Sequence, residues 1–159
     1  TSSCKKIDGS ILTDELNSLA DKLSYAEDHN EIGSQEVDQL KKYYSLLEIK
    51  DFLLTKKVQE KCNIHPVAIV YFYSNKRNCD DCQKQGYVLT SLRENYPQLR
   101  VYTFDYDLDS SAIQTLISLH EIGNQLPAIM INDKVYNGFQ SIENIKKELP
   151  SLTQTIKKN

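Results

Sequence analysis

Two cysteines separated by two residues are the part of this 159-residue sequence with the most definite chemistry. Cys79-Asp80-Asp81-Cys82 follows an apolar run and begins a segment with helical periodicity. A cysteine at a helix N-terminus meets unpaired N–H groups and the positive end of the helix dipole, which stabilise a thiolate. Cys79 would attack a disulfide sulfur, and Cys82, one helical turn later, would resolve the mixed disulfide. The motif therefore predicts a catalytic pair for thiol–disulfide exchange.

Charged residues surround the first cysteine on both sides. Asp80 and Asp81 oppose a thiolate at Cys79 by like-charge repulsion, while Lys76 and Arg77 just upstream partly compensate. We expect these four residues to tune the pKa of the Cys79 thiol. An alternative interpretation of the two acids is that they only complement the dipole in the first turn of the helix.

The other two cysteines, Cys4 and Cys62, are equally distant in sequence from Gly33, where the chain is expected to turn. Two antiparallel helices of equal rise return to the same level, so the two thiols are expected to meet there. We predict that they form a structural disulfide, which would imply an oxidising compartment. The alternative is that they are two unrelated thiols.

A metal site is the sharpest competing interpretation of the cysteines. Cys62-x2-His65 followed by Cys79-x2-Cys82 has the ligand types and spacing of a zinc site. A hydrophobic strand fills the spacer, which suits an α/β unit better than a zinc knuckle, so we expect no metal and no separate cofactor. The alternating acids of residues 105–109 lack the turn glycine of a calcium loop and are interpreted as a strand end and a helix cap.

The N-terminal third has the periodicity of two helices. Thr13 is expected to cap the first helix, whose apolar residues recur at helical spacing from Leu16 to Ala26. Residues 29–33 break the pattern, and Ser34 is expected to cap a second helix. We interpret residues 13–61 as an antiparallel helical hairpin.

From Val67 onward the pattern is that of an α/β domain. Val67–Tyr73 is a β-branched and aromatic run typical of a strand buried on both faces. The pattern then predicts, in order, a helix over residues 79–96, a strand over 99–104, a helix from Ser110 or Ser111 to about His120, a β-hairpin with strands at 128–131 and 134–136, and a helix capped by Ser141 that runs to Leu149.

From about Ile64 to Leu149, this order and spacing resembles the thioredoxin family. Val67–Tyr73 is similar to the strand that leads to the active site, Cys79–Cys82 to the CxxC motif, and Leu126-Pro127-Ala128-Ile129 to the loop with the family's cis-proline. The resemblance implies a thioredoxin-like domain over residues 63–159, with a mixed sheet flanked by helices, behind a helical hairpin at residues 1–62. It also implies that Pro127 is cis and adjacent to Cys79, and that the Leu126 backbone pairs with an extended substrate.

The sequence departs from the family at the site itself. Asn78 replaces the usual Trp before the first cysteine, and Asp80-Asp81 replaces the Gly-Pro often found between the cysteines. Tyr71 or Tyr73 stands where thioredoxins place a buried acid that helps to deprotonate the resolving cysteine. A different base, or water, must serve here.

Composition and charge restrict the partners. A formal charge of −3 and a pI near 5.6 give no general attraction for nucleic acid. The longest apolar run is too short to cross a bilayer, so membrane association is expected only through an anchor preceding Thr1. We expect an extracytoplasmic thiol:disulfide oxidoreductase that acts on protein thiols and disulfides and works with a redox partner protein. The alternatives are a cytoplasmic location and a redox-silent module that only binds peptides.

Overall fold

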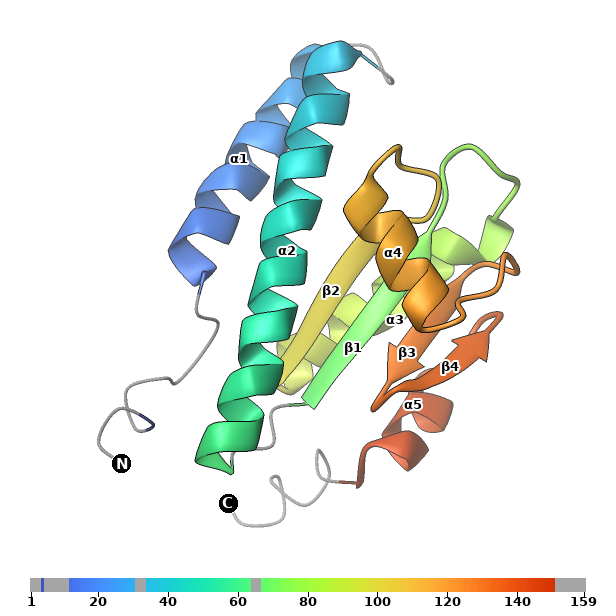
Figure 1. Cartoon of the computed structure of the whole chain (residues 1–159). Coiled ribbons are helices and arrows are strands. Elements are labelled where there is room, and N and C mark those ends of the chain that lie inside the picture. Colours follow the sequence, from blue (N-terminus) through green and yellow to red (C-terminus); the bar gives the residue numbers. More distant parts are fainter. Residues whose placement is uncertain (1–3, 5–11, 31–33, 64–66, 151–159) are drawn as a thin grey trace. The chain divides into compact units, whose positions relative to one another are not determined.

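The computed structural model describes residues 4, 12–30, 34–63 and 67–150 (Figure 1). The chain divides into two compact units. One holds the two N-terminal helices and residues 108–113, and the other holds the sheet with the helices that flank it. The domain boundary that the sequence suggests, between residues 62 and 63, stays a prediction.

The N-terminal unit contains the predicted helical hairpin. Helix α1 spans Thr13–His29 and helix α2 spans Gln35–Cys62. The prediction that Thr13 caps α1 is wrong, because Thr13 is the first helical residue and Leu12 occupies the N-cap position without a side-chain cap. The Leu12 N–H instead donates to the Asp51 carboxylate of α2, 3.1 Å away. A long-range bond thus joins the start of α1 to α2.

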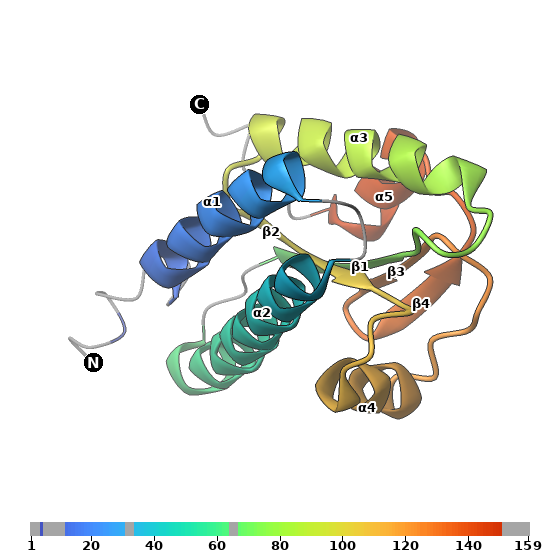
Figure 2. The ribbon, with the colours of Figure 1, turned by 90° about the horizontal axis from the view of Figure 1, so that it is seen from above.

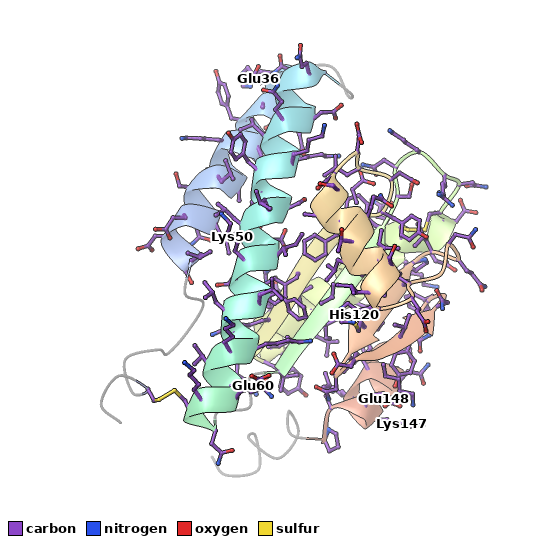
Figure 3. The ribbon with its side chains drawn as sticks, in the orientation of Figure 1. Glu36, Lys50, Glu60, His120, Lys147 and Glu148 are labelled. Carbon is purple, nitrogen blue, oxygen red and sulfur yellow. A yellow bond between two sulfur atoms is a disulfide. The ribbon has the colours of Figure 1, made fainter. Side chains whose placement is uncertain are left out.

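Helix α2 has capping residues at both ends. The Ser34 hydroxyl accepts a hydrogen bond from the Val37 N–H at 3.3 Å, as the sequence predicted, and Glu36 in the first turn complements the helix dipole (Figure 3). At the other end Asn63 adopts a left-handed conformation with φ 53°, which Asn tolerates better than most residues. The predicted turn at residues 31–33 lies outside the described residues.

A disulfide joins Cys4 to Cys62 at the C-terminal end of α2, with a Cα–Cα distance of 5.6 Å (Figure 3). The pairing predicted from the positions of the two cysteines is confirmed. The bond closes a loop with a sequence separation of 58 and so encloses both helices of the hairpin.

The second unit is built on a four-stranded mixed sheet with the order β2-β1-β3-β4. Strands β1 (Val67–Tyr73) and β2 (Leu99–Asp105) pair in parallel, and the parallel connection requires the crossover helix α3 (Asp80–Asn95) between them. Strand β3 (Ala128–Ile131) pairs antiparallel with β1 and with β4 (Lys134–Asn137). β1 is therefore a central strand, as its apolar sequence predicted.

Helices cover both faces of this sheet. Figure 2 shows α3 and α5 (Ile142–Glu148) on one side and α4 (Ser111–Leu119) on the other. On the α3 side the core contains alternate residues of β1 together with Leu89 and Leu92 of α3 and Ile145 of α5. On the other side the rings of Phe72 and Phe104 lie 5.7 Å apart, both fully buried.

The C-terminal turn and helix cap form at the residues where the sequence predicted them. Asn132 and Asp133 both have positive φ, which gives the two-residue turn that joins β3 to β4. The Ser141 hydroxyl accepts a hydrogen bond from the Asn144 N–H and caps α5. The α/β architecture predicted for this region is confirmed. Among the described helices, none has the length and apolar character needed to cross a membrane.

Replacing both Cys4 and Cys62 with Ser should lower the free energy of unfolding of the hairpin by about 4 kcal/mol, because the open loop gains chain entropy when it unfolds. Urea denaturation followed by far-ultraviolet circular dichroism measures the change. A double variant with the same midpoint and slope as the native protein would contradict a stabilising role for the bond. Both proteins keep the Cys79/Cys82 pair, so a difference in their stability reports the Cys4–Cys62 bond alone.

Candidate active site

Cys79 occupies the N-cap position of α3, directly after the loop that follows β1. The helix begins at Asp80, no side chain caps it, and the Cys82 N–H bonds to the Cys79 carbonyl at 3.2 Å. Free N–H groups of the first turn and the positive end of the dipole therefore lie next to the Cys79 side chain. A disulfide joins Cys79 and Cys82, with their Cα atoms 5.4 Å apart.

The two cysteines differ in their contact with solvent. Cys79 is half-buried, whereas Cys82 is only 7% exposed. Of the two tyrosines that the sequence placed near the pair, Tyr71 donates a hydrogen bond from its hydroxyl to the Cys82 carbonyl. Burial raises the pKa of Tyr71 to about 12, so the phenol is protonated at neutral pH.

The loop between β1 and α3 is held by a polar network. The buried Ser74 hydroxyl donates to the Asp107 carboxylate and accepts from the N–H groups of Lys76 and Arg77 at 3.1 and 3.2 Å. The Arg77 guanidinium binds both oxygens of Asp107, at 2.9 to 3.1 Å, and lies 5.1 Å from the centre of the Tyr106 ring. The chain is therefore fixed just before it reaches Cys79.

A second set of hydrogen bonds joins α3 to the proline loop. The fully buried Gln85 side chain accepts from the Gln140 N–H at 2.7 Å and donates to the Gln140 carbonyl at 3.1 Å. The Gln140 side chain donates to the Gly138 carbonyl, and the Gly138 N–H donates to the Pro127 carbonyl at 2.8 Å. Gly138 has φ +88°, a conformation that favours glycine. A continuous path of hydrogen bonds thus links the helix of the cysteines with Pro127.

The predicted site residues have the following surroundings. The Leu126–Pro127 peptide bond is cis; Pro127 is buried and Leu126 is half-buried. Asp80 and Asp81 are exposed in the first turn of α3. Arg77 is paired with Asp107, so its predicted effect on the Cys79 thiol stays a prediction.

The zinc alternative loses three of its four proposed ligands. Cys62 is bonded to Cys4, and Cys79 is bonded to Cys82, so these sulfurs are not thiolates in this structure. His65, the fourth proposed ligand, lies outside the described residues. The described residues hold no cluster of three His, Cys, Asp or Glu side chains arranged for a metal ion.

A pocket of about 420 Å³ lies between α3 and the sheet, with Cys82 among its lining residues. Tyr71, Cys82 and Leu89 are buried and form its inner part. Its outer part is formed by exposed residues of α3, namely Gln83, Tyr87, Thr90 and Arg93. The pocket therefore extends from the surface to the less exposed cysteine.

Three residues of this site were missed or only partly found from the sequence. Asp107 was assigned to a helix cap, and Gln85 was not singled out. Their partners lie 30 and 55 positions away in the chain, so no local pattern marks them. Tyr71 was one of two candidates, and only the contact with Cys82 distinguishes it from Tyr73.

No protein-family model and no curated protein matches the sequence. Solved structures similar to this chain include thioredoxins. Thioredoxin O1 from Arabidopsis thaliana is 18% identical, with a TM-score of 0.48 over 64% of this chain and 89% of its own. Thioredoxin O2 from the same plant is 17% identical, with a TM-score of 0.44 over 52% and 74%. Mitochondrial thioredoxin 3 from Saccharomyces cerevisiae is 16% identical, with a TM-score of 0.38 over 66% and 90%.

The C-terminal unit has a thioredoxin-like α/β fold. Its elements follow the order β1-α3-β2-α4-β3-β4-α5, its sheet has the order β2-β1-β3-β4, its CxxC motif begins α3, and a proline precedes β3. The sequence predicted the element order, the central position of β1, the CxxC motif at the start of a helix and the proline before a strand, whereas the full strand order comes from the structure.

Replacing Gln85 with Leu should lower the free energy of unfolding by about 2 kcal/mol, because the Gln140 N–H and carbonyl lose their partners while the volume is nearly kept. Chemical denaturation measures the loss. Gln83→Leu, on the exposed side of the same helix, is the matched control and should change stability by much less. Equal effects of the two substitutions would contradict a special role for the buried amide.

Arg77, by its hydrogen bonds, holds the pKa of Asp107 below its ordinary value of 3.8. A carboxylate whose pKa is depressed by folding stabilises the protein above its unfolded pKa, and this contribution is lost as the pH falls through the folded pKa. The loop before Cys79 should therefore keep its bonds down to pH 3.8 and lose them below it. The Arg77 side-chain N–H resonance, followed by NMR against pH, should titrate below that value. A midpoint at or above pH 3.8 would contradict the pairing of Arg77 with Asp107. As a control, the Arg77 resonance in Asp107→Asn should not change over this pH range.

Proposed function

We propose that this chain is a thiol:disulfide oxidoreductase whose working pair is Cys79 and Cys82. The observation that carries the proposal is a disulfide at the start of a helix whose two cysteines are unequally exposed. A half-buried sulfur at the N-cap is in reach of a partner and is favoured as a thiolate. A buried sulfur one turn later is protected from partners but close enough to attack its neighbour.

The reaction divides between the two cysteines. In the reduced protein the Cys79 thiolate attacks one sulfur of a partner disulfide, forms a mixed disulfide and releases the other sulfur as a thiolate. Cys82, as a thiolate, then attacks the Cys79 sulfur, closes the intramolecular disulfide and releases the reduced partner. Two electrons pass from the cysteine pair to the partner. The reverse sequence oxidises a dithiol, and no cofactor is needed in either direction.

The protein substrate is proposed to bind at the proline loop. Leu126 is half-buried, and its chain neighbour Pro127 is tied through Gly138 and Gln140 to the helix of the cysteines. A backbone held in this way is suited to pair with an extended peptide, since fixed main-chain groups cost little entropy when they bind. Asp80 and Asp81, exposed beside Cys79, would favour substrates with basic residues near their disulfide.

The proposed location is an oxidising compartment outside the cytoplasm. The Cys4–Cys62 bond supports it, because structural disulfides persist in exported proteins and are rare in the cytosol. In such a compartment a redox partner protein would return the Cys79/Cys82 pair to its working state after each turnover.

The test is a trapping experiment. Cys82→Ser in the full chain should accumulate a mixed disulfide with a disulfide-containing protein such as insulin, because the nucleophile remains and the resolving thiol is gone. The native protein should accelerate insulin reduction by dithiothreitol. Cys79→Ser, the matched control, should trap nothing and should reduce insulin at the uncatalysed rate. Non-reducing electrophoresis and precipitation of the insulin B chain measure the two outcomes.

Failure of the native protein to accelerate the exchange would refute the proposal and leave a redox-silent module that only binds peptides. Trapping through Cys82 rather than Cys79 would reverse the assigned roles. Peptide mapping of the adduct identifies the cysteine.

A further inference from the structure

The Cys82 thiol must lose its proton before it can attack, and the site offers no obvious base for it. Tyr71 is a polar side chain in contact with Cys82, but its hydroxyl already donates to the Cys82 carbonyl. With a pKa of about 12, this phenol does not become a phenolate at neutral pH. Among the described residues that line the pocket at Cys82, none carries a carboxylate.

The pocket itself connects Cys82 with solvent. Its inner part includes Cys82 and Tyr71, and its outer part is formed by exposed residues one and two turns further along α3. Its volume of about 420 Å³ is many times the roughly 30 Å³ that one water occupies in the liquid. Hydroxyl and amide groups along the wall, including those of Thr90, Thr103 and Gln83, can bind such waters.

Gly86 keeps this space open. It lines the pocket in the middle of α3, and a Cβ built there would meet nothing within 4 Å among the described residues. Glycine within a helix costs stability relative to alanine, and its φ is not one that requires glycine. The absence of a side chain at this point therefore serves the pocket rather than the backbone.

We propose that this pocket is the route by which water exchanges protons with the Cys82 thiol, and that Gly86 keeps the route open. The inference rests on the function proposed above. Cys82 gives its proton to a pocket water, the resulting thiolate attacks the Cys79 sulfur of the mixed disulfide, and the partner leaves as a thiolate. In the reverse direction Cys82 leaves as a thiolate and takes a proton from the same water.

Few charged or titratable side chains other than Cys82 line this pocket. Tyr71 and Tyr73 come from β1, Tyr87 and Arg93 from α3, and β2 contributes Val101 and Thr103, which do not titrate. Burial raises the pKa of Tyr71 to about 12, so this phenol does not titrate near pH 7. The pH dependence of resolution should therefore report the Cys82 thiol.

Gly86→Leu tests the route, because it adds a bulky apolar side chain at a pocket-lining position where a Cβ meets nothing within 4 Å. Gly86→Ala is the matched control, since it makes the same backbone change with little added volume. Reduced proteins are mixed with 5,5′-dithiobis(2-nitrobenzoate) in a stopped-flow instrument. The first thiolate released reports attack by Cys79, and the second reports attack by Cys82.

The first phase should be equal in both variants. The second phase at pH 7 should be at least threefold slower in Gly86→Leu, since a thiol pKa higher by one unit lowers the thiolate tenfold while nucleophilicity rises about threefold. Thr90→Leu narrows the outer part of the pocket, one helical turn after Gly86, and should also slow the second phase. This variant tests the route if Gly86→Leu does not fold. Second phases that coincide in all variants across pH would overturn the proposal.

A titration separates this inference from the proposed function. In reduced Cys79→Ser, the absorbance of the Cys82 thiolate at 240 nm gives the pKa of that thiol without any turnover. Adding Gly86→Leu should raise this pKa by about one unit relative to Gly86→Ala, because water is excluded from the sulfur. An unchanged pKa would refute the solvent route even if the native protein exchanges disulfides. Loss of exchange in the native protein, with the pKa shift intact, would refute only the function.

Discussion

The site depends on one constraint, the position of β1 at the centre of the sheet. β1 pairs in parallel with β2, and a parallel pair cannot be joined by a short turn. The chain must therefore leave the carboxyl end of β1, cross over as α3 and return to the start of β2. The start of α3 thus comes just beyond the end of β1, which places Cys79 at an exposed helix N-terminus. β1 also pairs antiparallel with β3, with Phe72 opposite Ala128. The proline that precedes β3 therefore lies at the same end of the sheet as the start of α3.

The elements that the sequence predicted are those whose cause is local. The apolar run of β1, the caps Ser34 and Ser141 and the turn at Asn132-Asp133 all carry their signal in a few neighbouring residues. Thr13 lies inside α1 rather than at its N-cap, and the preceding residue, Leu12, is bound by a carboxylate of α2 that is distant in sequence. A contact of this kind leaves no local signal in the sequence.

The residues of the candidate site likewise divide into those with a signal in the sequence and those without one. The CxxC motif and the disulfide of Cys4 with Cys62 were predictable from residue type and spacing, and the proline loop was predicted from the family resemblance. Asp107 and Gln85 were not, since each acts through a partner that only the fold brings near. Gln85 binds the backbone of Gln140, and Asp107 binds the side chains of Ser74 and Arg77, so neither belongs to a motif that the sequence could show. Their contribution is to fix the proline loop and the loop before Cys79.

Tyrosine in place of an acid changes the electrostatic character of the site. A buried carboxylate near a thiol is either a base or a repelling charge, depending on its protonation. A phenol with a raised pKa is neutral over the whole physiological range, and its hydrogen bond to the Cys82 carbonyl ties β1 to the first turn of α3. The cysteine pair therefore has a rigid neutral support, and the charges beside it are the exposed ones on the helix and loop.

The disulfide between Cys4 and Cys62 also determines how the chain would carry a mechanical load. Tension applied at the N-terminal end would pass from Cys4 through the sulfur atoms to Cys62, a few residues before β1. The hairpin enclosed by the bond would lie outside the line of force and would keep its helices. Reduction of the bond would place the whole loop in series with the pull and release about 200 Å of extended chain. Under load, the redox state of Cys4 and Cys62 would thereby set the length of chain between the N-terminal end and β1.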